Sequence, residues 1–90
     1  MKIIKISAMW CPSCILMNNV FNRLKKAYPS IEFLEYDYDF DEEKVKSYNP
    51  GDVLPVFIFE ENMELERIQG EHSYEEIEKI IKRYVHEENN

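Results

Sequence analysis

Two cysteines separated by two residues, Cys11 and Cys14, are the side chains of this sequence best suited to chemistry. The spacing places both thiols within one helical turn, close enough to form a disulfide. Pro12 follows Cys11 and is favoured at the first position of a helix, where its missing N–H costs no hydrogen bond. Cys11 then lies at the helix N-terminus, which favours a thiolate. We expect Cys11 to attack a substrate disulfide and Cys14 to resolve the resulting mixed disulfide.

A pair of cysteines with this spacing also suits two other roles. A structural zinc site needs four ligands, and the other candidates, His72 and His86, do not follow the spacing of a second half-site. We therefore expect no bound metal. Cysteines also occur as inert core residues. A strand that leads directly into a helix at the pair favours the redox interpretation over both alternatives.

The pattern of apolar residues predicts the elements that position this pair. It indicates an α/β chain in the order βαβαββα, with a four-stranded mixed sheet flanked by helices. The first two strands are expected to be parallel and the last two antiparallel. The predicted strands cover residues 3–8, 31–37, 56–59 and 63–68. The first helix is expected to begin at Pro12, the second to end near Tyr48 and the third to begin after Ser73.

Local signals predict where the helices begin and end. Tyr28 precedes a proline, which disfavours helical backbone and ends the first helix there. Either Asp39 or Asp41 suits the N-cap of the short second helix. Ser73 and Glu76 have the spacing of a capping box for the last helix.

Composition and charge limit the partners of the chain. The 90 residues include 44% hydrophobic ones, which suffices for one domain, placed here at residues 1–86 with a frayed tail at 87–90. A net charge of −7 opposes nucleic-acid binding. The apolar stretch at the start is short and contains lysine, so it resembles neither a signal peptide nor a membrane span. We expect a cytoplasmic monomer with no membrane partner.

The stretch Trp10-Cys11-Pro12-Ser13-Cys14 resembles the redox motif of the thioredoxin and glutaredoxin superfamily. The tryptophan is typical of thioredoxins, whereas the order Cys-Pro-x-Cys is typical of glutaredoxins. The resemblance covers nearly the whole chain and implies a minimal thioredoxin-like fold. It also implies dithiol–disulfide oxidoreductase activity on protein disulfides, modulated by the residues around the cysteines. No cofactor is expected beyond the redox-active disulfide itself.

A second segment, Asp52–Phe57, is similar to the superfamily segment that carries a cis-proline facing the two cysteines. The resemblance implies that the Leu54–Pro55 bond is cis and that the Leu54 backbone pairs with a bound substrate segment. Gly70, which precedes the last helix, matches the superfamily as well. An exposed Trp10 beside the reactive thiol is expected to dock protein substrates.

Two features depart from the superfamily pattern. Glutaredoxins hold glutathione with a Thr-Val-Pro segment and a Gly-Gly pair, but this sequence has Val53 in place of the threonine and Glu71 after a single glycine. We therefore expect a reductase, or another low-molecular-weight thiol, as electron donor. A glutathione-linked glutaredoxin is the alternative within the class. A thioredoxin-fold binding or adaptor module, or a dimer that holds an iron–sulfur cluster, is the alternative outside it.

The second departure concerns a pair of charges. Thioredoxins place a buried aspartate six residues before the first cysteine, near a lysine of the neighbouring strand. This sequence has Lys5 at that position, and Glu35 aligns opposite it. We expect the two to pair beneath Cys14, with Glu35 accepting the proton of the resolving thiol. The alternative is that Lys5 extends to solvent across a thinly covered face of the sheet.

Overall fold

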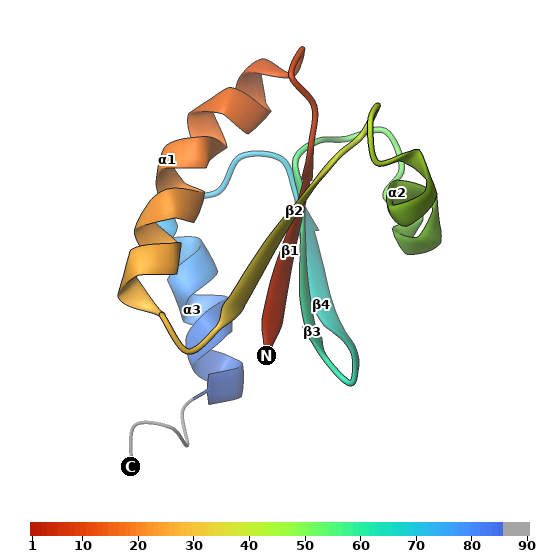
Figure 1. The fold of residues 1–90 in the computed structure, drawn as a ribbon. Coiled ribbons are helices and arrows are strands. Elements are labelled where there is room, and N and C mark those ends of the chain that lie inside the picture. The colour runs from red at the N-terminus through yellow and green to blue at the C-terminus, as the bar shows by residue number, and fades with distance from the viewer. Residues whose placement is uncertain (86–90) are drawn as a thin grey trace.

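The computed structural model describes residues 1–85, in which a four-stranded sheet carries helices on both faces (Figure 1). The sheet has the order β2-β1-β3-β4, with β1 and β2 parallel and the other neighbours antiparallel. The expected βαβαββα order and mixed sheet are confirmed. The expected domain end at residue 86 and the tail at 87–90 lie outside the described residues. The elements are β1 (Lys2–Ser7), α1 (Pro12–Ala27), β2 (Glu32–Asp37), α2 (Glu42–Tyr48), β3 (Val56–Glu61), β4 (Met63–Gln69) and α3 (Tyr74–Val85).

The central strands are mostly buried because both faces of the sheet are covered, and apolar residues dominate them apart from Lys5, Ser7 and the strand ends. Helices α1 and α3 pack on one face and α2 on the other (Figure 1). The face under α1 and α3 is built around Ile3, Phe21, Phe57, Phe59 and Ile81. The face under α2 is built around Ile4, Ile6, Val45, Val56 and Ile58, and both cysteines belong to its core.

The first helix begins at the cysteine pair for a local reason. Cys11 is the N-cap of α1, with extended backbone (φ −97°, ψ 110°), and Pro12 takes the first helical position. The helix ends at Tyr28, ahead of Pro29, as predicted. Because β1 ends at Ser7, only a short turn separates the central strand from the cysteines, and the sheet fixes where they lie.

Helix α2 begins after Asp41, one of the two expected N-cap positions, but without the expected capping hydrogen bond. Asp41 is the N-cap residue, but its side chain makes no hydrogen bond to the helix and instead accepts one from the Asp37 backbone N–H, 2.8 Å away. The Asp37 carboxylate in turn accepts from the backbone N–H groups of Asp39 and Phe40. These carboxylates close the tight turn before the helix, a competing use of short acidic side chains. The predicted capping role of Asp39 is therefore wrong, and its carboxylate bonds Trp10.

Candidate active site

The two cysteines lie at the N-terminus of α1 as free thiols in direct contact. The backbone N–H of Cys14 donates a hydrogen bond to the Cys11 sulfur over 3.1 Å. Cys11 is 6% exposed and Cys14 is 2% exposed, so Cys11 is the thiol nearer to solvent. An N–H aimed at a sulfur stabilises negative charge on it, which suits a nucleophile at Cys11.

The surroundings of Cys14 oppose its ionisation. Burial, reinforced by its hydrogen bond with Cys11, raises the pKa of the Cys14 thiol to about 11. A backbone contact with Ala8 and the positive charge of Lys5 act in the opposite direction. Cys14 therefore holds its proton at neutral pH, and it must lose that proton before it can attack a disulfide.

The segment before β3 comes within reach of Cys11. The Leu54–Pro55 peptide bond is cis, as the resemblance implied. The Cys11 thiol donates to the Leu54 carbonyl oxygen over 3.8 Å, so this backbone lies against the sulfur. Gly70, at φ +80°, donates its backbone N–H to the Pro55 carbonyl oxygen over 2.8 Å. A residue with a Cβ disfavours that backbone conformation, and the glycine ties the end of β4 to the cis-proline segment.

Lys5 is completely buried, so the alternative in which it extends to solvent is wrong. The register of β1 and β2 places it directly opposite Glu35, and its ammonium lies 3.2 Å from a Glu35 carboxylate oxygen. The ammonium also donates to the Asn18 side-chain oxygen. The Ser7 hydroxyl donates to the same Glu35 oxygen over 3.1 Å. The four side chains form one hydrogen-bonded network under α1, here called the Lys5 network.

A hollow connects this network to the Cys14 thiol. Its volume is about 260 Å³, and Cys14 lines it together with Ser7, Asn18, Glu35 and Asp37. The Glu35 side chain is 48% exposed, so its carboxylate lies where the network meets solvent. A carboxylate beside the hollow that Cys14 lines is placed to exchange protons with solvent.

Two residues of the motif hold carboxylates from distant segments. The Trp10 indole N–H donates to the Asp39 carboxylate over 2.7 Å, and the Tyr38 ring meets the indole edge to face. The Ser13 hydroxyl donates to the Glu71 carboxylate, also over 2.7 Å. We call Asp39 and Glu71 the two anchored carboxylates.

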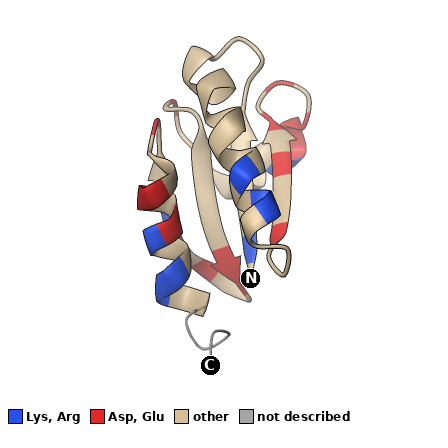
Figure 2. Cartoon of the chain, turned by 90° about the vertical axis from the view of Figure 1, so that its left-hand side faces the viewer, with Lys and Arg blue, Asp and Glu red and all other residues tan. Residues whose placement is uncertain are grey.

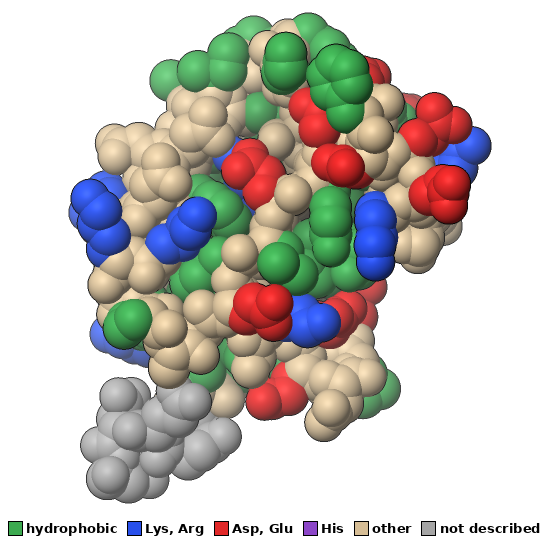
Figure 3. Space-filling view, viewed as in Figure 1, with side chains coloured by type: hydrophobic (Ala, Val, Ile, Leu, Met, Phe, Trp, Pro, Cys, Tyr) green, Lys and Arg blue, Asp and Glu red, His purple; other side chains and the backbone are tan. Residues whose placement is uncertain are grey.

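Exposed apolar side chains surround the motif. The charged residues of α1 begin only at Arg23, and Figure 2 shows its N-terminal part without blue or red. Trp10, expected to be exposed, is 62% exposed. Figure 3 shows hydrophobic side chains gathered at the end of the molecule where α1 begins, with acidic side chains directly beneath them. The exposed large apolar side chains at this end are Met9, Trp10, Ile15, Leu16 and Val53.

Sequence reasoning missed the positions of Asn18 and Ser7. Asn18 follows Cys14 by four residues, a spacing that puts both on one helix face. Ser7 follows Lys5 by two residues, which puts both on one face of β1. These spacings were available as signals. The Asn18 amide and the Ser7 hydroxyl both contact the Lys5–Glu35 pair. This arrangement exists only once β1, β2 and α1 pack together.

Within residues 1–85, no group of three or more His, Cys, Asp or Glu side chains is arranged to hold a metal ion. The helices of that same stretch include none long and apolar enough to cross a membrane.

The family model described as Thioredoxin matches residues 1–83. Thioredoxin H5 of Oryza sativa subsp. japonica is 35% identical over 69 residues, which cover 76% of this chain and 50% of that protein. Glutaredoxin-3 of Mus musculus is 28% identical over 78 residues, which cover 87% of this chain and 23% of that protein. The chain therefore spans only about a quarter to a half of the length of these two relatives.

Solved structures match the fold over most of its length. Thioredoxin of Fasciola hepatica superposes with a TM-score of 0.82 at 25% identity, covering 92% of this chain and 79% of that one. A malaria parasite thioredoxin-2 superposes with a TM-score of 0.85 at 25% identity, covering 92% of this chain and 82% of the other.

Proposed function

Because the chain belongs to the thioredoxin family, we propose that it is a thiol–disulfide oxidoreductase that works through Cys11 and Cys14. The observation that carries the proposal is the N–H of Cys14 aimed at the Cys11 sulfur at the start of α1. The cis-proline segment against that sulfur supports it. The functional unit is one domain of residues 1–86.

The first exchange takes place at Cys11. Its thiolate attacks one sulfur of a substrate disulfide, the substrate S–S bond breaks, and a mixed disulfide with Cys11 forms. The other substrate sulfur leaves as a thiolate and takes up a proton. The Leu54 carbonyl, next to the Cys11 sulfur, accepts a backbone N–H of the bound segment. Trp10 provides an apolar contact beside it, and Pro55 and Gly70 hold this segment in place.

The second exchange takes place at Cys14. Its thiol loses a proton and attacks the Cys11 sulfur, which breaks the mixed disulfide and releases the second substrate thiol. Two electrons have then passed to the substrate, and the protein holds a Cys11–Cys14 disulfide. A reductase or a low-molecular-weight thiol restores the dithiol with two electrons. Pro12 and Ser13, between the cysteines, modulate how readily this disulfide opens.

Glu35 is the proton acceptor that we propose for Cys14. Its carboxylate lines the same hollow as the thiol, and Lys5 and Ser7 hold it by hydrogen bonds. The buried Lys5 ammonium lies close enough to Cys14 to favour its thiolate, which makes Lys5 a positioning residue for the same step.

The substrates that we propose are proteins that contain a disulfide, because exposed apolar side chains around a reactive thiol suit contact with a polypeptide. We further propose that the protein works as a cytoplasmic monomer, without nucleic acid or membrane as partner. The cysteine pair itself is the redox group, and we propose no other cofactor.

Trapping tests the proposal. In Cys14→Ser, the mixed disulfide on Cys11 has no resolving thiol, so target proteins stay covalently bound and are released by dithiothreitol. The matched control, Cys11→Ser, keeps Cys14 but should capture no targets by disulfide. Capture of the same targets by Cys11→Ser would show that the nucleophile is wrongly assigned. Absence of any dithiothreitol-sensitive complex with Cys14→Ser would favour a binding or adaptor module.

A glutathione-linked activity is the second candidate, favoured by the similarity to Glutaredoxin-3 and by the Cys-Pro-Ser-Cys order. Against it stands Glu71, whose carboxylate is bonded to Ser13 inside the motif and would repel the anionic tripeptide. Turnover of a glutathione mixed disulfide with glutathione as sole reductant would support this second candidate. Turnover that requires a protein reductase would oppose it.

A further inference from the structure

Two negative charges are fixed beside the motif by hydrogen bonds. The Asp39 carboxylate is held by the indole just before Cys11, and the Glu71 carboxylate by the hydroxyl of Ser13. Asp39 comes from the segment that leads into α2, and Glu71 from the segment that leads into α3. These helices cover opposite faces of the sheet (Figure 1), so the charges approach the motif from two sides.

Little positive charge lies near these carboxylates. The start of α1 is uncharged, and Figure 2 shows acidic segments on either side of it. The nearby Lys46 is paired with Glu42 over 3.0 Å, and Lys5 is buried against Glu35. The exposed end of the molecule therefore presents apolar side chains bordered by acidic ones, as Figure 3 also shows.

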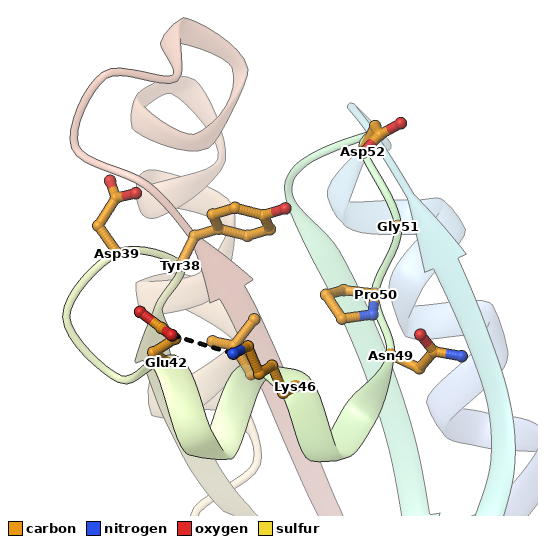
Figure 4. A pocket seen from close by; sticks show the side chains of 9 residues that line it. Tyr38, Asp39, Glu42, Lys46, Asn49, Pro50, Gly51 and Asp52 are labelled. Carbon is orange, nitrogen blue, oxygen red and sulfur yellow. Dashed lines mark ion pairs between the residues drawn. The ribbon is translucent and has the colours of Figure 1, made fainter.

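A cavity of about 480 Å³ continues the acidic border of this surface away from the cysteine motif. It lies between the start of α2 and the loop before the cis-proline, and Asp39 belongs to its wall (Figure 4). Asp52 lines it as well, together with Glu42 and its ion-pair partner Lys46, and the Tyr38 ring spans its upper part (Figure 4). Buried Val45 and Pro50 add apolar surface. Carboxylates beside an aromatic ring suit a lysine or arginine side chain, whose stem is apolar and whose end is cationic.

We propose that the two anchored carboxylates, Asp39 and Glu71, make this protein select disulfides that lie in positively charged polypeptide segments. The inference rests on the proposed function and names the substrate class of the same site. A basic side chain near the reacting cysteine of the substrate enters the cavity beside Asp39, while its apolar neighbours contact the exposed side chains of α1.

Charge complementarity favours this occupant over two others. A second copy of the chain presents the same acidic border and carries a net charge of −7, so self-association through this end is repulsive. Small anionic disulfides such as oxidised glutathione meet the same repulsion and have no apolar segment to offset it. A basic and apolar polypeptide satisfies both features of the surface.

The experiment compares three peptide disulfides in single-turnover reduction by the pre-reduced protein. The peptides have the same length and are linked to the same neutral fluorescent thiol, and their cysteine is flanked by lysine, glutamine or glutamate. At low ionic strength we expect the second-order rate constant to be roughly tenfold higher for the lysine peptide than for the glutamate peptide. The ratio should approach one in about 1 M salt, where the Debye length is about 3 Å.

The double variant Asp39→Asn with Glu71→Gln removes both charges but keeps an oxygen acceptor for each hydrogen bond. We expect the lysine-to-glutamate rate ratio to fall at least about threefold. The matched control, Glu32→Gln with Glu61→Gln, removes two charges at the opposite end of the sheet and should keep the ratio of the unmodified protein.

A ratio near one in the unmodified protein at low salt would overturn the inference. So would a control variant that lowers the ratio as much as the site variant, because the preference would then follow net charge alone. Both results leave reduction of the glutamine peptide intact. Failure to reduce that neutral peptide would instead overturn the proposed function, and the inference with it.

Discussion

At the scale of single residues, Cys11 and Cys14 lie in contact, but their surroundings suit them to different steps of the proposed exchange. The Cys11 sulfur already receives a backbone hydrogen bond, whereas the pKa of Cys14 is raised by burial to about 11. A thiol with that pKa is almost entirely protonated at neutral pH. The resolving step therefore needs a group that takes the proton, and the Glu35 carboxylate lines the hollow next to it.

The variant Glu35→Gln tests this proton transfer. We expect release of product from the Cys11 mixed disulfide to slow at least about tenfold at neutral pH, because the base is missing. The deficit should shrink as the pH rises toward about 11, where the Cys14 thiolate forms without a base. Single-turnover release of the substrate thiol, followed from about pH 6 to pH 10, measures both effects.

The matched control for this experiment is Glu32→Gln, on the same strand and at its far end. This control should keep the unmodified pH profile. A Glu35→Gln profile that matches the unmodified one would show that the carboxylate does not accept the proton. The result would leave the proposed nucleophilic role of Cys11 untouched, since the proposed attack on substrate precedes this step.

At the scale of elements, each helix begins with a different set of local interactions, and these have different consequences. Cys11 and Pro12 begin α1, which makes the helix start and the reactive pair the same structure. A turn closed by aspartates precedes α2 and leaves Asp39 free to bond Trp10. Helix α3 begins with a full capping box between Ser73 and Glu76.

The capping box of α3 gives a stability prediction. Glu76 accepts from the Ser73 backbone N–H over 2.8 Å, and the Ser73 hydroxyl accepts from the Glu76 N–H over 3.1 Å. Ser73→Ala should lower the free energy of unfolding by about 1 kcal/mol, because helix N–H groups lose their partner. Urea denaturation measures this. Ser47→Ala, inside α2, is the control and should cost less, and equal losses would contradict the capping role.

At the scale of the whole molecule, apolar side chains serve two separate purposes. Those on both faces of the sheet are buried and hold the helices to it. Those around the cysteine motif are exposed at one end, bordered by acidic residues (Figure 3). Side chains that stay exposed remove little apolar surface from water, so those at the motif contribute little to folding.

Substitution of one buried and one exposed isoleucine tests this division. Ile81 of α3 is fully buried, and Ile81→Ala should cost about 2–5 kcal/mol of unfolding free energy through lost contacts and a cavity. Ile15 of α1 is 59% exposed, and Ile15→Ala should change stability by less than about 0.5 kcal/mol. Urea denaturation of both variants measures the difference. A large loss in Ile15→Ala would show that the apolar end belongs to the core.

Much of the fold followed from the sequence because its signals act over a few residues. Proline after Cys11 indicates the start of α1, Ser73 and Glu76 indicate the start of α3, and apolar runs indicate the strands. The cis bond at Pro55 and the pairing of strands followed from resemblance to the superfamily and from connection rules. The aspartates before α2 were ambiguous, since short carboxylates bond a turn as readily as a helix.

The sequence by itself thus determined the cysteine pair, its place at a helix N-terminus and the α/β order. Resemblance to the superfamily placed the Leu54–Pro55 segment and the Lys5–Glu35 pair beside it, and only the tertiary structure decided its other neighbours. The two partners of the Lys5 ammonium lie 13 and 30 residues away in the chain, and those of the Trp10 indole and the Ser13 hydroxyl lie 29 and 58 residues away. No local pattern encodes such contacts, because they exist only once the sheet brings the ends of its strands and the start of α1 together.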